Sequence, residues 1–203
     1  MISVVDYGVA NLGSMLNMLH KVGAPARRVG TPEELAQASK IVLPGIGAFD
    51  QGMGALAERG LVEPLRRKAL DERVPLLGVC LGMQMLGFGS EEGVSDGLGL
   101  IPMRCRRLRL PAGDRLKVPH MGWNTIVQRR ASPLLQGLDE QARFYFVHSY
   151  HAVCERDEDV LATTLYGVEF ISVVECGNIR GVQFHPEKSH RYGMALLGNF
   201  AAL

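Results

Sequence analysis

Strand-like and helix-like segments alternate through the first 80 residues, and this alternation constrains the fold more than any other feature. Strand-like runs lie at residues 2–6, 26–29, 40–43 and 74–79, and all of them except 26–29 are mainly apolar. Between them, apolar residues recur at helical spacing, as at Leu12, Met15 and Leu19, where Gly23 ends the pattern. Parallel strands need crossover connections, and right-handed helical crossovers cover both faces of a sheet. The first half therefore predicts a mostly parallel central sheet with flanking helices.

The second half has a different pattern, in which strand-like runs follow one another through turns. These runs lie at residues 98–110, 116–128, 143–154, 160–166 and 170–184. Cys176-Gly177-Asn178-Ile179 is typical of a tight hairpin, and residues 189–202 have the apolar spacing of a closing helix. These elements fill the chain and leave no segment for a second domain. We expect a single α/β domain over residues 1–203, with antiparallel strands added in the second half.

Composition and charge exclude several classes of function. The chain is 47% hydrophobic and 21% charged, with a net charge of +1, so it has no electrostatic bias toward nucleic acid or membranes. The N-terminus lacks the basic region of a signal peptide, and the apolar run 74–89 is too short to span a bilayer. Cys80, Cys105, Cys154 and Cys176 form no CxxC pair, which predicts reduced thiols in the cytoplasm. We expect neither a metal nor a cofactor.

Cys80 lies between Gly78 and Gly82, where the fourth apolar run meets the helix-like residues 81–88. Gly-x-Cys-x-Gly matches the nucleophile elbow, in which a sharp strand-to-helix turn needs small neighbours. A thiol at a helix N-terminus favours the thiolate, and the Leu81 N–H would point toward an oxyanion beside the sulfur. The alternative, a buried structural thiol, is the interpretation kept for the other three cysteines.

A thiol nucleophile needs a base, and the base needs a group that orients it. In His185-Pro186-Glu187, proline favours an extended His185, so the His185 and Glu187 side chains would lie on the same side. The carboxylate can then accept the Nδ1–H and leave Nε2 facing Cys80. Taken alone, the motif would be a turn with a surface carboxylate. With the elbow, it predicts a Cys80, His185, Glu187 triad. Other histidines are better explained as structural groups: His20, His148, His151 and His190.

Several longer motifs resemble the triad-type (class I) glutamine amidotransferases. They are VVDYGVANLGS, LPGIGAFDQGM, GVCLGMQMLG, VPHMGWN, FYFVHSYH and GVQFHPEKS. The elbow and HPE identify the superfamily, whereas DYGxxNL, PHMGWN and HPEKS together are similar to glutaminase subunits of imidazole glycerol phosphate synthase, an enzyme of histidine biosynthesis. Ala10 and Ile46 stand where that family usually has glycine and valine, and neither change removes a reacting group.

The resemblance implies hydrolysis of L-glutamine to glutamate and ammonia through a glutamyl thioester on Cys80. His185 would protonate the leaving ammonia and then activate water. The implied substrate-binding residues are Gln84, Glu92, Ser149 and Tyr150. The implied oxyanion strand is Gly45, Ile46 and Gly47, which would add a second N–H donor to that of Leu81. Its glycines would let this peptide adopt more than one orientation.

The resemblance also implies a partner, the cyclase subunit, a (β/α)₈ barrel that would consume the ammonia within a one-to-one heterodimer. The reaction would yield imidazole glycerol phosphate and aminoimidazole carboxamide ribonucleotide. The implied interface residues are Tyr145, Lys188 and, in a PHMGWN loop, His120, Trp123 and Asn124. The alternatives are that Tyr145 is an ordinary strand residue, that Lys188 is a solvated lysine and that Trp123 belongs to the core. The basic clusters at 66–68, 104–109 and 129–130 are interpreted as solvated faces.

Three other functions compete with this hypothesis. Another class I amidotransferase would serve anthranilate, guanylate or pyridoxal phosphate synthesis, but PHMGWN and DYGxxNL argue against it. A stand-alone thiol hydrolase of the same fold, such as a γ-glutamyl peptidase, would need no partner. A catalytically dead binding subunit predicts a missing nucleophile, base or orienting group, and all three are present. We expect the isolated chain to be slow and the partner to activate it.

Overall fold

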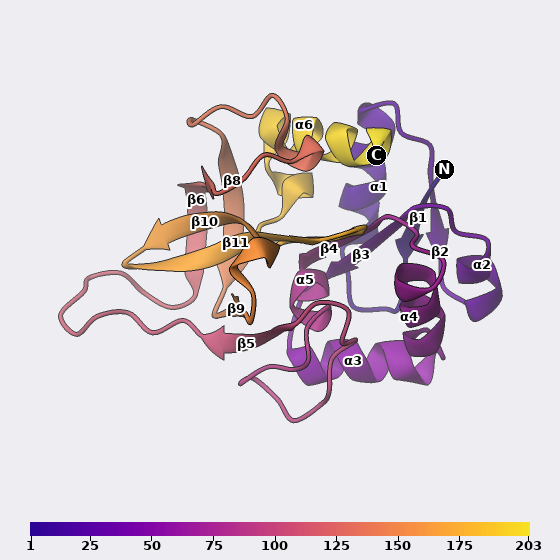
Figure 1. The fold of residues 1–203 in the computed structure, drawn as a ribbon, viewed down its shortest axis with the longest axis horizontal. Coiled ribbons are helices and arrows are strands. Elements are labelled where there is room, and N and C mark those ends of the chain that lie inside the picture. The colour runs from indigo at the N-terminus through magenta and orange to yellow at the C-terminus, as the bar shows by residue number, and fades with distance from the viewer.

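A computed structural model describes all 203 residues, and its main sheet of ten strands runs through the whole molecule (Figure 1). The parallel part has the order β2-β1-β3-β4-β12, in which β12 comes from the far end of the chain. Its strands are β1 (Ile2–Val5), β2 (Ala26–Val29), β3 (Ile41–Gly45), β4 (Leu76–Cys80) and β12 (Ile179–Val182). The predicted parallel sheet is therefore confirmed, and β12 joins the second half of the chain to it.

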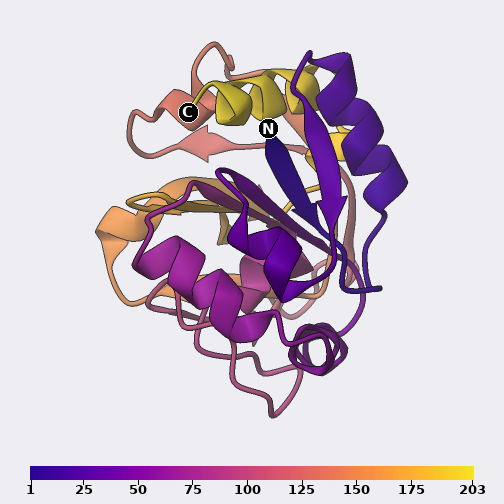
Figure 2. The same cartoon turned by 90° about the vertical axis from the view of Figure 1, so that its right-hand side faces the viewer.

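Helices cover both faces of this sheet (Figure 2). One layer contains α1 (Leu12–Lys21) and α6 (His190–Ala202), and the opposite layer contains α2 (Pro32–Ala36), α3 (Phe49–Glu58), α4 (Val62–Leu70) and α5 (Leu81–Met85). Successive strand residues face opposite layers: Val42 packs with the α1 and α6 side chains, and Leu43 packs with those of α3 and α4. None of the helices combines the length and apolar composition needed to cross a bilayer.

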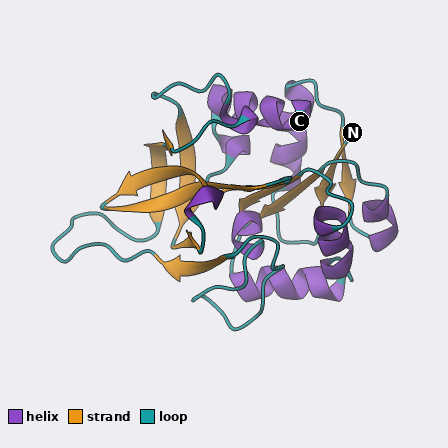
Figure 3. Ribbon diagram, in the orientation of Figure 1, coloured by secondary structure: helices purple, strands orange, loops and turns teal.

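The second half adds antiparallel strands to the edge of the parallel sheet and builds a separate two-stranded sheet (Figure 3). The added strands are β5 (Met103–Arg107), β7 (Val127–Gln128), β9 (Tyr150–Cys154), β10 (Val160–Tyr166) and β11 (Val168–Cys176). The small sheet pairs β6 (His120–Thr125) with β8 (Arg143–His148). Short 3₁₀ turns lie at η1 (Pro133–Leu135), η2 (Asp157–Asp159) and η3 (Pro186–Lys188). The predicted hairpin is confirmed, with Gly177 at φ +59° between β11 and β12.

Several sequence predictions were wrong about local structure. PHMGWN is not a loop: most of it forms β6, inside the run 116–128 that was also predicted as strand-like, and its backbone pairs with β8 from His120–His148 to Thr125–Arg143. The run 143–154 is two strands in different sheets, divided at Ser149. The helix predicted at 81–88 ends at Met85, and the strand predicted at 98–110 covers only 103–107. Each difference depends on hydrogen bonding to a distant segment, which local sequence propensity does not predict.

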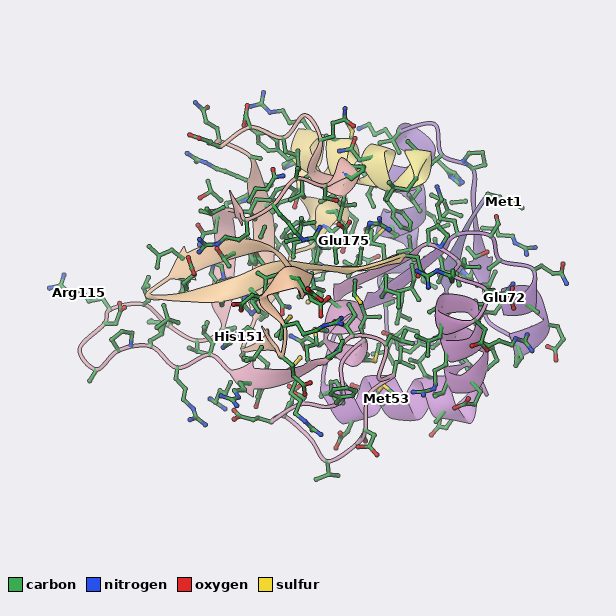
Figure 4. All side chains as sticks on the ribbon, in the orientation of Figure 1. Met1, Met53, Glu72, Arg115, His151 and Glu175 are labelled. Carbon is green, nitrogen blue, oxygen red and sulfur yellow. The ribbon has the colours of Figure 1, made fainter.

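Of the basic pair at 129–130, Arg129 is exposed as predicted, but Arg130 pairs with a buried carboxylate instead of being simply solvated. Glu175, which lies on β11 and is labelled in Figure 4, accepts hydrogen bonds from Arg130 at 2.8 Å, Arg180 at 2.7 Å and the Ser132 hydroxyl at 2.8 Å. Burial alone would raise the pKa of the Glu175 carboxyl, but these hydrogen bonds and charges lower it. Arg130 therefore neutralises a buried carboxylate and holds the 129–132 segment against β11.

Candidate active site

Cys80 ends β4 and begins the turn into α5 with an unusual backbone conformation, φ 54° and ψ −108°. Such a conformation costs a non-glycine residue about 1–3 kcal/mol and is typical of functional sites. Both flanking glycines are required by close packing. A Cβ on Gly78 would lie 2.8 Å from the Gly82 backbone, and one on Gly82 would lie 1.8 Å from the Leu43 carbonyl oxygen. The structure therefore contains the sharp strand-to-helix turn that the sequence predicts.

His185 and Glu187 form a buried pair: His185 Nδ1 lies 2.8 Å from Glu187 Oε1, and their side chains are 2% and 5% exposed. Because a carboxylate oxygen accepts, Nδ1 carries the hydrogen. The predicted pairing is present, but the predicted extended conformation is wrong beyond His185, because Pro186–Lys188 forms a 3₁₀ turn. Glu187 is not a surface carboxylate. The turn is held by the Ser189 hydroxyl, which donates to the His185 carbonyl at 2.6 Å.

The electrostatics of His185 favour its charged form. Burial lowers the pKa of the imidazole, but the nearby Cys80 sulfur and the Glu187 carboxylate together raise it to about 10. Nε2 is buried and makes no hydrogen bond, while Cys80 lies close enough to affect the ring. At neutral pH the ring is therefore an imidazolium beside the sulfur. That is the arrangement in which a thiol gives up its proton to become a nucleophile.

A cavity of about 330 Å³ opens onto Cys80 and His185. It gathers most of the residues that the sequence analysis singled out, which come from separate parts of the chain: Ile46, Gly47, Cys80, Leu81, Gln84, Glu92, Ser149, Tyr150 and His185. Pro119, Val147 and His148 also line it, and no sequence signal assigned them to the site. Glu187 lies behind His185, and Gly45 lies at the end of β3. The cavity thus combines a thiol, an imidazolium, a carboxylate and an amide.

The Ile46 N–H does not serve the sulfur in this conformation. It donates to the Val9 carbonyl oxygen at 3.2 Å. The strand before it is anchored by Tyr7, whose buried hydroxyl donates to the Pro44 carbonyl at 2.8 Å. Gly47 follows at φ +90°, which only glycine adopts without strain. A rotation of the Gly45–Ile46 peptide would be needed before this donor could face an oxyanion at Cys80.

Two buried histidines beside the cavity form a hydrogen-bonded chain. His148 Nδ1 lies 2.9 Å from the Tyr150 carbonyl and therefore carries a hydrogen. Its Nε2 then accepts from His120 Nδ1 at 3.1 Å, and Asn124 Nδ2 lies 3.4 Å from His120 Nε2. His120 was predicted near a partner interface, but it is 2% exposed, stacked between Phe146 and Tyr166. The hydrogen bonds from His120 through His148 to the Tyr150 carbonyl link β6 to the corner between β8 and β9.

This pair predicts a stability that falls in acid. Burial lowers the pKa of His120 to about 4 and that of His148 to about 3, against 6.5 for an unfolded histidine. Between the folded-state pKa values and 6.5, the unfolded chain binds protons that the folded chain does not. The free energy of unfolding is therefore highest above pH 6.5 and falls as the pH drops below it. At pH 5, unfolding should take up about two protons at these sites, each worth about 1.4 kcal/mol per pH unit.

The measurement is the free energy of unfolding by denaturant at several pH values from 7 to 5. His120→Phe keeps an aromatic ring between Phe146 and Tyr166 but cannot titrate, so its stability should depend less steeply on pH by about one proton. An equal pH dependence in both proteins would show that His120 is not held neutral.

Of the other predicted interface residues, Trp123 on β6 and Tyr145 on β8 form a cross-strand pair on one face, and Lys188 of η3 lies beside Tyr145. Trp123 is 46% exposed, so the core interpretation is wrong, and its ring stacks on His190 with centroids 5.3 Å apart. Lys188 Nζ lies 5.7 Å from the centre of the Tyr145 ring. The Asn124 amide points inward, where it donates to the Leu165 carbonyl at 3.0 Å. His190, which the sequence assigned a structural role, is exposed here and adopts φ +46°.

Comparison with known proteins places this chain in a family. The family model for class-I glutamine amidotransferases matches residues 3–202. A chain of PurLQS from Thermotoga maritima superimposes with a TM-score of 0.70 at 20% identity, covering 99% of this chain and 94% of that one. The glutaminase domain of CTPS from Trypanosoma brucei gives 0.64 at 17% identity, covering 99% and 93%. The chain belongs to the class-I glutamine amidotransferase family.

Within that family, its similarity to HisH subunits extends over the full length. It is 50% identical to imidazole glycerol phosphate synthase subunit HisH 2 of Pseudomonas aeruginosa, over all of both chains. It is 48% identical to subunit HisH 2 of Methanococcus maripaludis, over 98% of each, and 46% identical to subunit HisH of Bdellovibrio bacteriovorus, over all of both. At these identities and lengths, the chain is a member of the HisH group.

Proposed function

We propose that this chain hydrolyses L-glutamine to glutamate and ammonia as the glutaminase subunit of an imidazole glycerol phosphate synthase of histidine biosynthesis. The observation that carries the proposal is the convergence of Cys80, His185 and Glu187 at the cavity. Full-length similarity to HisH subunits supports the pathway. It favours this function over a different class I amidotransferase.

Each proposed catalytic residue has a role that follows from its geometry. The Cys80 thiolate attacks the side-chain amide carbon of glutamine, and the carbonyl oxygen becomes an oxyanion near the Leu81 N–H. His185 Nε2 gives its proton to the leaving nitrogen, so ammonia departs and a glutamyl thioester remains on Cys80. Water then loses a proton to His185 and attacks the thioester, which releases glutamate and regenerates the thiolate. Glu187 keeps Nδ1–H fixed throughout.

The substrate's α-amino and α-carboxylate groups need partners of opposite charge or hydrogen-bonding type. Glu92 lines the cavity, and its Oε2 already accepts the Phe49 N–H at 2.9 Å, so Oε1 remains for the α-ammonium. Gln84, Ser149 and Tyr150 also line the cavity and offer further polar groups. We assign these residues to glutamine binding.

We further propose a cyclase partner in a one-to-one complex that takes up the ammonia. The support is an exposed face next to the cavity, where Trp123 and Met121 are 46% and 62% exposed, with Tyr145 and Lys188 beside Trp123. Ile46, 45% exposed, places the oxyanion strand within reach of a partner. The unpaired cysteines suit the cytoplasm as the compartment.

The test is glutamine turnover by the purified chain, alone and with the cyclase carrying its ribonucleotide ligand. We expect the complete complex to be about 10²–10³-fold faster, because one oxyanion donor contributes that much and the Ile46 N–H is bonded to Val9 in the resting chain. Glu33→Ala, an exposed position on α2 at the opposite end of the molecule from β6 and β8 (Figure 1), is a surface control that should be activated equally. Equal turnover with and without the cyclase would contradict the gating. Hydrolysis of γ-glutamyl peptides by the chain alone would favour a stand-alone thiol hydrolase.

A further inference from the structure

Gln183 is a completely buried polar side chain beside Cys80 that the proposed mechanism does not use. It directly follows β12, which pairs in parallel with β4 at Val182–Val79, so the register brings Gln183 next to Cys80. Its Nε2 lies 3.8 Å from Cys80 Sγ, and its Oε1 lies 3.1 Å from Gln84 Nε2. One amide therefore contacts both the proposed nucleophile and a proposed substrate-binding residue.

The orientation of both amides follows from their partners. Gln84 Nε2 lies 3.0 Å from the Tyr150 carbonyl, which can only accept, so this end of Gln84 must be the nitrogen. Its second hydrogen then points to Gln183, which must present its oxygen there. The Gln183 nitrogen consequently faces Cys80. The Tyr150 main-chain carbonyl thus determines the orientation of both amides in the hydrogen-bonded series from Gln84 through Gln183 to the Cys80 sulfur.

The orientation of the Gln183 amide distinguishes the neutral thiol of Cys80 from its thiolate. The Val147 carbonyl lies 3.9 Å from Sγ and can only accept, so it is a partner for the neutral S–H. Gln183 Nε2 can only donate, so it is a partner for the thiolate. A hydrogen bond to a charged group is worth more than one to a neutral group, and in a buried site no water replaces it.

We propose that Gln183 is a positioning residue with two linked tasks. It donates an N–H to the Cys80 sulfur and thereby favours the thiolate, and it holds Gln84 with its Oε1 free for the α-ammonium of the substrate. The first task concerns the thiol alone, whereas the second rests on the proposed glutaminase function. Gln84 lines the cavity, so its remaining oxygen is available there.

The experiment compares Gln183→Met and Gln183→Glu with the unchanged full chain. Met fills a similar volume without a donor, and Glu replaces the donor with a negative charge or a carboxyl group. The rate of Cys80 alkylation by iodoacetamide is followed against pH, with peptide mass mapping to separate Cys80 from the other cysteines. We expect the midpoint of the rate profile to rise by about one pH unit in Gln183→Met and by more in Gln183→Glu.

The second readout is steady-state glutamine hydrolysis by the complex with the cyclase. Releasing Gln84 should raise KM about tenfold in Gln183→Met, since one substrate hydrogen bond is lost. Gln141→Met, an exposed glutamine with no side-chain partner, is the matched control and should change neither readout. A purely structural role would lower thermal stability but leave the alkylation midpoint unchanged, and that result in a folded variant overturns the proposal.

A measurement on the unchanged chain keeps the proposal testable if both variants fail to fold. The side-chain ¹⁵N resonance of Gln183 should shift when Cys80 is alkylated, and an unmoved resonance overturns the proposal. The outcomes also separate the two hypotheses. If the alkylation midpoint rises in the variants but the complex does not hydrolyse glutamine, the proposed function fails and the role of Gln183 at the thiol stands.

Discussion

Cys80→Ala should lower glutamine hydrolysis by the complete complex about 10⁴–10⁶-fold while leaving the chain folded. The substitution removes the only thiol at the cavity, and His185 cannot replace it as a nucleophile that forms a thioester. Alanine retains the Cβ, so the strained turn at φ 54° is unchanged and any loss of activity does not arise from relief of strain. The measurement is ammonia release in the presence of the cyclase and its ligand.

The matched control is Cys154→Ala, a half-buried cysteine on β9 outside the cavity. It should retain the activity of the unchanged chain, so that a general effect of removing a thiol can be recognised. More than about 1% residual activity in Cys80→Ala would contradict a thioester mechanism, since loss of a nucleophile costs far more than that in comparable enzymes. Binding of the cyclase by Cys80→Ala would show that its surface is intact.

Gly82→Ala should be among the most destabilising small substitutions in the chain, with a loss of more than about 4 kcal/mol or no folded protein. Its Cβ would lie 1.8 Å from the Leu43 carbonyl oxygen and 2.9 Å from the Leu43 carbonyl carbon. Both are main-chain atoms of β3, so no side chain can move aside, and α5 must leave the sheet. The measurement is the free energy of unfolding by denaturant.

Gly54→Ala is the matched control, because it makes the same chemical change inside helix α3. A Cβ at Gly54 meets no heavy atom within 4 Å, so helix propensity alone decides the outcome. We expect a gain of about 1 kcal/mol. If the two variants had similar stabilities, close approach of α5 to β3 would not be the reason for glycine at position 82.

Sequence reasoning succeeded where short-range rules decide the structure. The parallel strands of the first half, the elbow at Cys80 and the 176–179 hairpin all follow from residue patterns within about ten positions. It also brought distant residues to one site, because the resemblance to a family supplied what periodicity could not. It failed for the turn after His185, which the nearby Ser189 hydroxyl holds. It also failed for the loop placed at PHMGWN and for Arg130, where pairing with a distant segment decides the structure.

By itself, the sequence determined the α/β class, the strained thiol and the residue types available for chemistry. Glycine placement and apolar periodicity are local constraints, and local sterics are enough to interpret them. Only the tertiary structure decided which buried polar groups meet. The His120–His148 hydrogen bond, the bond from Ile46 to Val9 and the place of Gln183 beside Cys80 all join segments that are far apart in the sequence. Strand register sets these contacts, and the packing of the whole sheet sets the register.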